Sequence, residues 1–209
     1  MQTKPLFVTG IGTYVGKTIV SAVLCEQLKA DYWKPVQSGD LDNTDSDQLK
    51  NLLSNTRTVI HPETFRLDLA ASPHQSAKAQ GLEITPAAFS LPQTENQLLV
   101  EGAGGLFVPL STSFLMTDLI RQLGAEVVLV VRNYLGCINH TLLSLQALAG
   151  LQIPLKHVIL NGAFNTDTRD VIIRHIPEGV TWSELPELST LNRWSVAEAP
   201  VQIHLQSKL

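Results

Sequence analysis

Short apolar runs alternate along the chain with segments whose apolar residues recur at helical spacing. The runs that predict buried strands cover residues 6–9, 32–34, 97–100, 127–131 and 156–160. The segments that predict helices cover residues 17–30, 44–54, 114–123 and 168–176, with one more helix ending near Gly150. Continuously apolar strands separated by helices are typical of a parallel sheet that is covered on both sides. The pattern therefore predicts an α/β fold with a mostly parallel sheet and helices on both faces.

Composition and charge narrow the class of protein. Hydrophobic residues make up 44% of the 209 residues and charged residues 16%, which supports a packed core and excludes an intrinsically disordered chain. The formal net charge of -4 argues against nucleic acid or an anionic membrane as the main partner, since both favour a basic surface. No apolar run approaches the roughly 18–20 residues that span a bilayer, and the N-terminus does not resemble a signal peptide. We expect one domain over residues 1–209 and a cytoplasmic location.

The strongest motif is a glycine-rich loop between the first predicted strand and the first predicted helix. It reads Gly-Ile-Gly-Thr-Tyr-Val-Gly-Lys-Thr from Gly10 to Thr18. Backbone N–H groups of such a loop bind phosphate oxygens, the Lys17 ammonium would reach the β- and γ-phosphates, and the Thr18 hydroxyl would coordinate magnesium. Five residues separate Gly10 from Gly16, one more than in the usual pattern. The alternative is a glycine-rich turn that binds nothing and contains Gly-Lys-Thr by chance. The predicted strand before this segment and the predicted helix after it favour the phosphate loop.

Other polar residues follow strands of the predicted sheet. Lys34, Glu101 and Asn161 lie at carboxyl ends of strands, as Gly10 does, and these ends meet at one edge of a parallel sheet. Glu101 is placed where nucleotide hydrolases keep a magnesium-associated carboxylate, although an acid at a strand end is often only solvated. A lone lysine such as Lys34 is usually a surface residue. Beside a phosphate loop, a second lysine suggests a substrate that is itself anionic.

Several motifs in order resemble the dethiobiotin synthase family. They lie at residues 8–10 with 15–18, 34–39 (Lys-Pro-Val-Gln-Ser-Gly), 46–47 (Ser-Asp), 72–74 (Ser-Pro-His), 100–105 and 136–140 (Gly-Cys-Ile-Asn-His). The family's first glycine-rich loop also has the extra residue. The resemblance implies an ATP- and magnesium-dependent ligase that carboxylates 7,8-diaminopelargonic acid with CO2 (or bicarbonate) and closes its ureido ring. The product is dethiobiotin, formed with ADP and phosphate through a carbamate and a carbamic-phosphoric anhydride.

The resemblance also implies roles for individual residues and a homodimer. The catalytic positions are Lys17, Lys34, Thr13 and Ser38. The nucleotide-binding positions are Gly12, Thr13, Tyr14, Val15, Gly16, Lys17, Thr18, Asn161, Pro186 and Glu187. The magnesium positions are Thr18, Asp47 and Glu101. The partner subunit would hold the substrate carboxylate with Leu135, Gly136, Cys137, Ile138 and Asn139. The sequence departs from the family in two places. Gly12 and Tyr14 stand in the loop where the family often has acids, and Glu187 stands where some relatives carry an aromatic residue.

Other classes of phosphate-loop protein are less consistent with the sequence. An ATPase of the partitioning or septum-positioning type, the main alternative, carries a second lysine inside the loop, and residues 11–15 contain none. A GTPase needs an Asn-Lys-x-Asp motif, which is absent, and a small-molecule kinase lid needs clustered arginines. An acid in a first helical turn, such as Asp47, usually complements the helix dipole. Two roles stay open for His74 and His140: each could contact a ligand or simply begin a helix.

Overall fold

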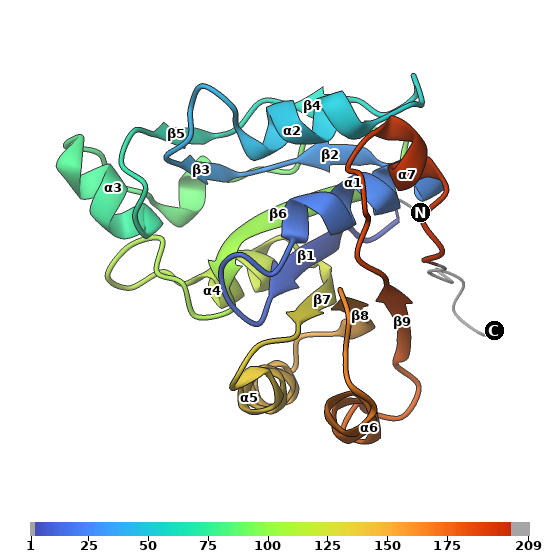
Figure 1. The fold of residues 1–209 in the computed structure, drawn as a ribbon. Helices are drawn as coiled ribbons and strands as arrows, with labels where there is room; N and C mark the ends of the chain where they lie inside the picture. The colour runs from blue at the N-terminus through green and yellow to red at the C-terminus, as the bar shows by residue number, and fades with distance from the viewer. Residues whose placement is uncertain (1–2, 202–209) are drawn as a thin grey trace.

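The computed structural model describes residues 3–201 and contains a seven-stranded sheet (Figure 1). Its strands are β1 (Leu6–Gly10), β2 (Asp31–Trp33), β4 (Ile60–His61), β6 (Leu98–Gly105), β7 (Glu126–Arg132), β8 (Leu155–Asn161) and β9 (Thr181–Leu185). They lie in the order β4-β2-β6-β1-β7-β8-β9, and each neighbouring pair is parallel. The parallel α/β sheet predicted from the apolar pattern is confirmed.

Helices cover both faces of the sheet. They are α1 (Lys17–Leu28), α2 (Asp45–Leu52), α3 (Pro73–Ala79), α4 (Met116–Gln122), α5 (Cys137–Gly150), α6 (Thr166–Arg174) and α7 (Arg193–Ala197). The chain leaves β1 through α1 toward one edge, whereas α4, α5 and α6 carry it toward the other edge. Right-handed crossovers in opposite directions place their helices on opposite faces. Accordingly α1 packs with α2 and α7, α5 packs with α6, and Figure 1 shows the two groups apart.

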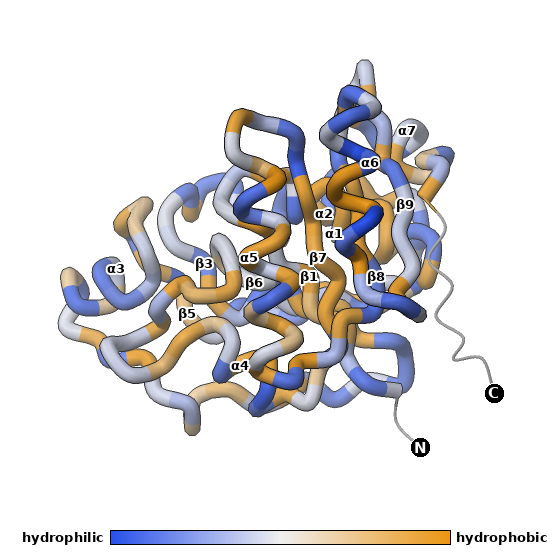
Figure 2. The backbone as a smooth tube through the Cα atoms, turned by 90° about the horizontal axis from the view of Figure 1, so that it is seen from below, coloured by the Kyte–Doolittle hydropathy of each residue, from blue (hydrophilic) through white to orange (hydrophobic). Residues whose placement is uncertain are grey.

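The core lies on the two faces of the central strands. In β7 all five residues from 127 to 131 are buried, as is every residue of β1. Figure 2 shows hydrophobic backbone positions concentrated in β1, β7 and β8 at the centre of the molecule. Strands buried on both sides have no polar face, which is why their sequences read as continuous apolar runs. Within residues 3–201 no helix is both long and apolar enough to cross a membrane.

Several elements differ from the prediction. A second, two-stranded sheet pairs β3 (Val36–Ser38) with β5 (Phe65–Leu67), and a short 3-10 helix η1 (Pro86–Ala88) follows α3. The strand expected to end at Val100 continues through Glu101 to Gly105, because β6 pairs with β1 along this stretch. The C-terminal region, where no helix or strand was predicted beyond residue 176, forms β9 and then α7, which ends at Ala197.

The strand order reverses beside β1, which lies between β6 and β7. In open parallel sheets, ligands bind beyond the carboxyl ends of the strands at such a reversal. The phosphate loop follows β1, Lys34 follows β2, and Glu101 lies in β6, the strand between them. The fold therefore brings these residues to one edge of the sheet.

Candidate active site

The phosphate loop runs from the end of β1 to the start of α1. Gly16 caps the helix with a φ of 86°, a left-handed conformation that residues with a side chain rarely adopt. A Cβ atom at this position would lie 2.1 Å from Nδ2 of Asn161, so only glycine fits. The same Nδ2 donates a 2.8 Å hydrogen bond to the carbonyl oxygen of Val15. Asn161, at the end of β8, thus holds the end of the loop in place.

Lys17 is buried at the first position of α1. Its ammonium donates a 3.4 Å hydrogen bond to the carbonyl oxygen of Gly12 and so lies across the loop. Burial lowers the pKa of Lys17 more than the nearby carboxylate of Glu101 raises it. An ammonium that has lost water and rests on a neutral carbonyl gains strongly from an anion, because charge-assisted hydrogen bonds are the stronger kind. This geometry suits a phosphate ligand.

A cluster of charged side chains lies next to the loop. The hydroxyl of Thr18 donates to Asp45 Oδ1 at 2.7 Å and approaches Glu101 Oε1 at 3.1 Å. The ammonium of Lys34 contacts the same Glu101 Oε1 at 3.2 Å and forms a second ion pair with Asp45 Oδ2. Lys34 and Glu101 are buried. Residues from α1, α2, β6 and the end of β2 therefore meet at one point.

The charges in this cluster stabilise one another. Burial by itself lowers the pKa of Lys34, but the carboxylates of Glu101 and Asp45 outweigh it and raise that pKa above its ordinary value. Burial favours the neutral form of Asp45, yet Lys34 and the hydrogen bond from Thr18 hold the pKa of this carboxyl below its ordinary value. Lys34 is thus cationic and Asp45 anionic at neutral pH. The lysine ammonium marks a place where a cation is favoured between two carboxylates.

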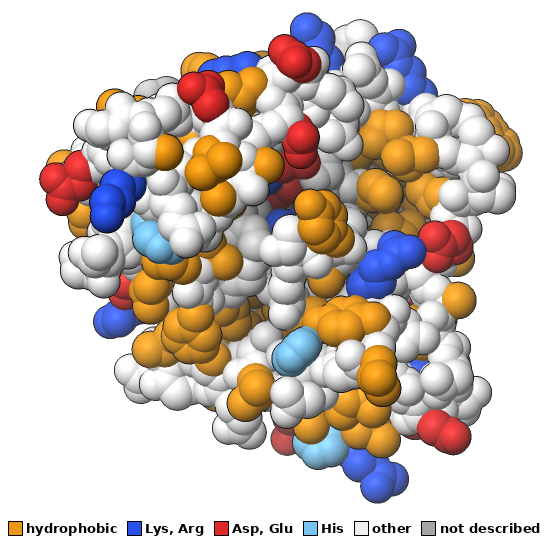
Figure 3. Space-filling model, turned by 60° about the vertical axis from the view of Figure 1, so that its left-hand side comes forward, with side chains coloured by type: hydrophobic (Ala, Val, Ile, Leu, Met, Phe, Trp, Pro, Cys, Tyr) orange, Lys and Arg blue, Asp and Glu red, His pale blue; other side chains and the backbone are white. Residues whose placement is uncertain are grey.

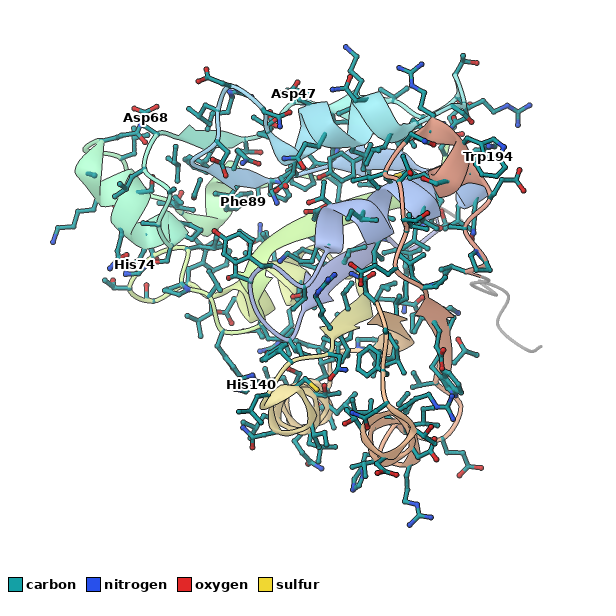
Figure 4. All side chains as sticks on the ribbon, in the orientation of Figure 1. Asp47, Asp68, His74, Phe89, His140 and Trp194 are labelled. Carbon is teal, nitrogen blue, oxygen red and sulfur yellow. The ribbon has the colours of Figure 1, made fainter. Side chains whose placement is uncertain are left out.

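Asp45 is the acid of α2 that joins this cluster, although the family motif predicts Asp47. Asp47 is exposed, and its Oδ2 accepts hydrogen bonds from the Thr44 backbone N–H at 3.1 Å and the Thr44 hydroxyl at 2.8 Å. These contacts complete a capping box at the start of α2. Figure 4 shows Asp47 on the outer side of the helix. The structure thus corrects the expected position by two residues.

Other predicted residues surround this core of the site. Thr13 and Tyr14 are exposed in the loop, Tyr14 with a φ of 59°. Ser38 ends β3, and its buried hydroxyl has no hydrogen-bond partner among the described residues. Pro186 and Glu187 follow β9 and are exposed, and Glu187 pairs with Arg132 at 3.1 Å. Because β9 lies beside β8, these two residues reach the same sheet edge as Asn161.

The segment expected to bind substrate in a partner subunit leads into α5. Gly136 caps this helix with a φ of 103°, and Leu135, Gly136 and Asn139 are exposed. Cys137 is buried, and Ile138 packs partly against the core. The first amide groups of a helix bind anions well, so an exposed start of α5 suits a carboxylate.

A pocket of about 400 Å³ lies between the phosphate loop and α5. Its walls come from residues 11–13, from residues 105–109 at the end of β6 and just after it, and from His140, Leu143 and Ser144. His140 is hydrogen-bonded through Nδ1 to the Tyr134 hydroxyl at 2.7 Å. Apolar walls with a few polar groups are typical of sites for small molecules that contain hydrocarbon.

Comparisons with known proteins identify the family of this chain. A family model described as an AAA domain matches residues 4–195. The ATP-dependent dethiobiotin synthetase of Cytophaga hutchinsonii is 46% identical over 88% of this chain and 89% of its own. That of Brucella ovis is 44% identical over 90% of this chain and 88% of its own. The chain belongs to the dethiobiotin synthetase family. The family resemblance seen in the motifs is confirmed.

Solved structures with a similar fold include proteins outside the dethiobiotin synthetase family. A ParA family ATPase from Chlorobium tepidum has a TM-score of 0.51 at 15% identity, covering 90% of this chain and 85% of its own. A nucleotide-binding protein from Archaeoglobus fulgidus, solved with ADP, has a TM-score of 0.50 at 10% identity, covering 93% and 85%. At such identities the likeness shows a shared phosphate-loop fold alone. The family assignment comes from the sequence relatives.

The donor set around Thr18 fits magnesium. Mg²⁺ prefers oxygen ligands and is usually held by one or two carboxylates together with substrate phosphates and water. Thr18, Asp45 and Glu101 supply a hydroxyl and two carboxylates beside the phosphate loop. Within residues 3–201 no group of three or more His, Cys, Asp or Glu side chains forms a metal cluster. A magnesium ion held here would take its remaining ligands from water and a bound nucleotide.

Proposed function

We propose that this chain is an ATP-dependent dethiobiotin synthetase, a single ligase domain over residues 1–209 that forms C–N bonds. The proposal rests on the family assignment together with one observation, the cluster beside the phosphate loop. The cluster consists of Thr18, Lys34, Asp45 and Glu101. That cluster combines a cation between two carboxylates with a hydroxyl from the first turn of α1. Lys34 in this cluster and Lys17 in the phosphate loop would supply positive charge where two anions, the nucleotide and the substrate carbamate, have to meet.

The reaction joins CO2 to both amines of 7,8-diaminopelargonic acid. One amine captures CO2 and loses a proton, which gives a carbamate. A carbamate oxygen attacks the γ-phosphorus of ATP, and ADP leaves. The second amine then attacks the carbonyl carbon of the resulting carbamic-phosphoric anhydride, the ureido ring closes, and phosphate departs with its electron pair. Each step brings like charges together or develops new negative charge, so fixed cations lower the barrier.

The residues of this chain fit these steps. Lys17 and the loop amides bind the β- and γ-phosphates. Lys34 faces the carbamate oxygen that attacks the γ-phosphorus. Thr18, Asp45 and Glu101 would hold a Mg²⁺ ion, which would supply further positive charge beside the phosphates. The hydroxyls of Thr13 and Ser38 lie near the reacting amines. Asn161, Pro186 and Glu187 bound the site of the base.

The substrate's hydrocarbon chain fits the pocket lined by Phe107 and Leu143, with a partner subunit contributing residues 135–139 to bind the carboxylate. Leu135 is fully exposed, and Leu143 and Phe107 are more than half exposed. Figure 3 shows hydrophobic patches on the side of the molecule that carries α3 and α5. Apolar side chains exposed around a pocket favour burial against another chain. The proposed active form is a cytoplasmic homodimer.

Phosphate release from ATP tests the function. The assay compares reactions with and without diaminopelargonic acid and with and without bicarbonate, in the presence of Mg²⁺. A dethiobiotin synthetase releases phosphate only when both co-substrates are present, and the product gains the mass of the ureido carbonyl. Release that does not depend on either co-substrate would instead support an assembly ATPase of the partitioning type. Replacing ATP by GTP or CTP in the same assay measures nucleotide preference.

A further inference from the structure

Tyr32 lies beneath the charged cluster and has no assigned role. Its side chain is completely buried in β2, and its hydroxyl donates a 3.0 Å hydrogen bond to Oε2 of Glu101. The other carboxylate oxygen, Oε1, faces the Thr18 hydroxyl and the Lys34 ammonium. Both oxygens of this carboxylate are therefore held, one from the core side and one from the side of the phosphate loop.

The strand register explains how these residues come together. Tyr32 pairs with Leu99 in the parallel ladder between β2 and β6. Glu101 lies two residues beyond Leu99, and Lys34 two residues beyond Tyr32, so the side chains of Tyr32, Lys34 and Glu101 project from the same face of the sheet. The Tyr32 ring spans the diagonal between the strands, which is within reach of an aromatic side chain. Main-chain pairing thus fixes the distance between the phenol and the carboxylate.

The chemistry of the phenol suits this place. Burial, followed by the nearby charge of Glu101, raises the pKa of Tyr32 well above its ordinary value, so the hydroxyl remains a donor. A hydrogen bond from a neutral donor to a buried carboxylate is stronger than one between neutral groups. A carboxylate held at one oxygen only could rotate about its terminal torsion, because that torsion is soft.

We propose that Tyr32 is a positioning residue, which orients Glu101 so that Oε1 faces Thr18 and the phosphate loop. The inference rests on the proposed function, because it assigns Tyr32 to the carboxylate that would help to hold magnesium with the nucleotide. Tyr32 is completely buried and so presents no surface to a nucleotide or substrate. Its effect on the reaction passes through Glu101.

The variant Tyr32→Phe keeps the ring and removes the hydroxyl. We measure binding of Mn²⁺, as a probe for Mg²⁺, to the protein with saturating ADP by electron paramagnetic resonance. Loss of one hydrogen bond to a charged group predicts about tenfold weaker Mn²⁺ binding in Tyr32→Phe. ADP binding without metal stays unchanged, because Lys17 and the loop amides are untouched. The matched control is Ser21→Ala, which removes a buried hydroxyl of α1 that has no hydrogen-bond partner among the described residues.

A double variant separates positioning from a general effect on the fold. If Tyr32 acts through Glu101, then Tyr32→Phe has no further effect on Mn²⁺ affinity in a Glu101→Gln background. Because residue 101 carries no charge in the double variant, the Tyr32→Phe change there leaves no buried carboxylate oxygen short of a hydrogen-bond donor. A further drop in that background, or equal Mn²⁺ affinity in wild type and Tyr32→Phe, overturns the inference. Absence of Mn²⁺ binding to wild type with ADP would instead contradict the magnesium site of the proposed function.

Discussion

Replacing Lys34 by glutamine tests how the charged cluster is balanced. In the structure two lysines, Lys17 and Lys34, face two carboxylates, those of Asp45 and Glu101. Lys34 contributes most directly, because its ammonium contacts both carboxylates and is 4% exposed. Glutamine keeps much of the side chain's length but carries no charge. The variant leaves one lysine opposite two carboxylates in a site with little water.

The size of the effect follows from burial. Removing one partner of a buried ion pair costs about 3–5 kcal/mol, because the charge left behind is uncompensated. The Asp45 side chain is 25% exposed, so water screens part of this cost and about 3 kcal/mol is the expected loss of unfolding free energy. Saturating Mg²⁺ with ADP brings positive charge to the same carboxylates, so the difference from wild type shrinks in their presence. Turnover falls by about 10²–10³, the usual cost of losing one fixed charge-stabilising contact.

Urea denaturation of wild type and Lys34→Gln, each alone and with Mg²⁺ and ADP, measures the stability difference. Calorimetry of ADP binding, which should stay close to wild type, and phosphate release at saturating substrates complete the set. The control is Lys50→Gln, an exposed lysine of α2 whose loss should change stability by less than about 0.5 kcal/mol. A Lys34→Gln protein as stable and as active as the control would refute the reasoning. Much weaker ADP binding in Lys34→Gln would show that Lys34 belongs to the nucleotide site.

Two further predictions concern stability and assembly. Burial alone would raise the pKa of Glu26, but hydrogen bonds from Asn55, Lys29 and Ser54 lower it from 4.5 to about 2. The ionised Glu26 carboxylate therefore stabilises the fold above about pH 4.5, and this stabilisation is lost as the pH falls toward 2. Glu26→Gln should lower the free energy of unfolding by roughly 3 kcal/mol at pH 7 and by little at pH 2. Thermal unfolding across this pH range measures the difference. If a partner's residues 135–139 complete the substrate site, mixing inactive Lys17→Ala and Asn139→Ala subunits should restore one working site per heterodimer. A fully active monomer in sedimentation experiments would contradict that arrangement.

The sequence predicted the central sheet well because its strands are buried on both faces. A run such as residues 127–131 has no polar position, and the structure buries every one of these residues. The elements that were missed are short or exposed. Strand β4 has two residues and β3 and β5 have three each, too few to show a period, and most of β9 is exposed. Their pairing depends on tertiary contacts that no local pattern carries.

The predicted end of β6 shows a different limit. Three glycines follow Glu101 within a few residues, and glycine usually weakens a strand. The strand nevertheless continues to Gly105, because Gly10 of β1 pairs opposite it. As a result Glu101 lies inside the strand and not beyond its end, which gives it a fixed direction between Thr18 and Tyr32. A residue in a ladder is positioned more rigidly than a residue in a loop.

The choice between Asp45 and Asp47 could have been made from helical spacing. Side chains three, four and seven residues apart share one face of a helix. Asp45 is four residues before Leu49 and seven before Leu52, both of which are buried, so it belongs to the inward stripe of α2. Asp47 is three residues from Lys50 and four from Asn51, which are exposed. A motif match aligned Ser46-Asp47 with the family, but a motif does not say which side of a helix is buried. The periodicity does, and it points to the carboxylate that the structure places against Thr18 and Lys34.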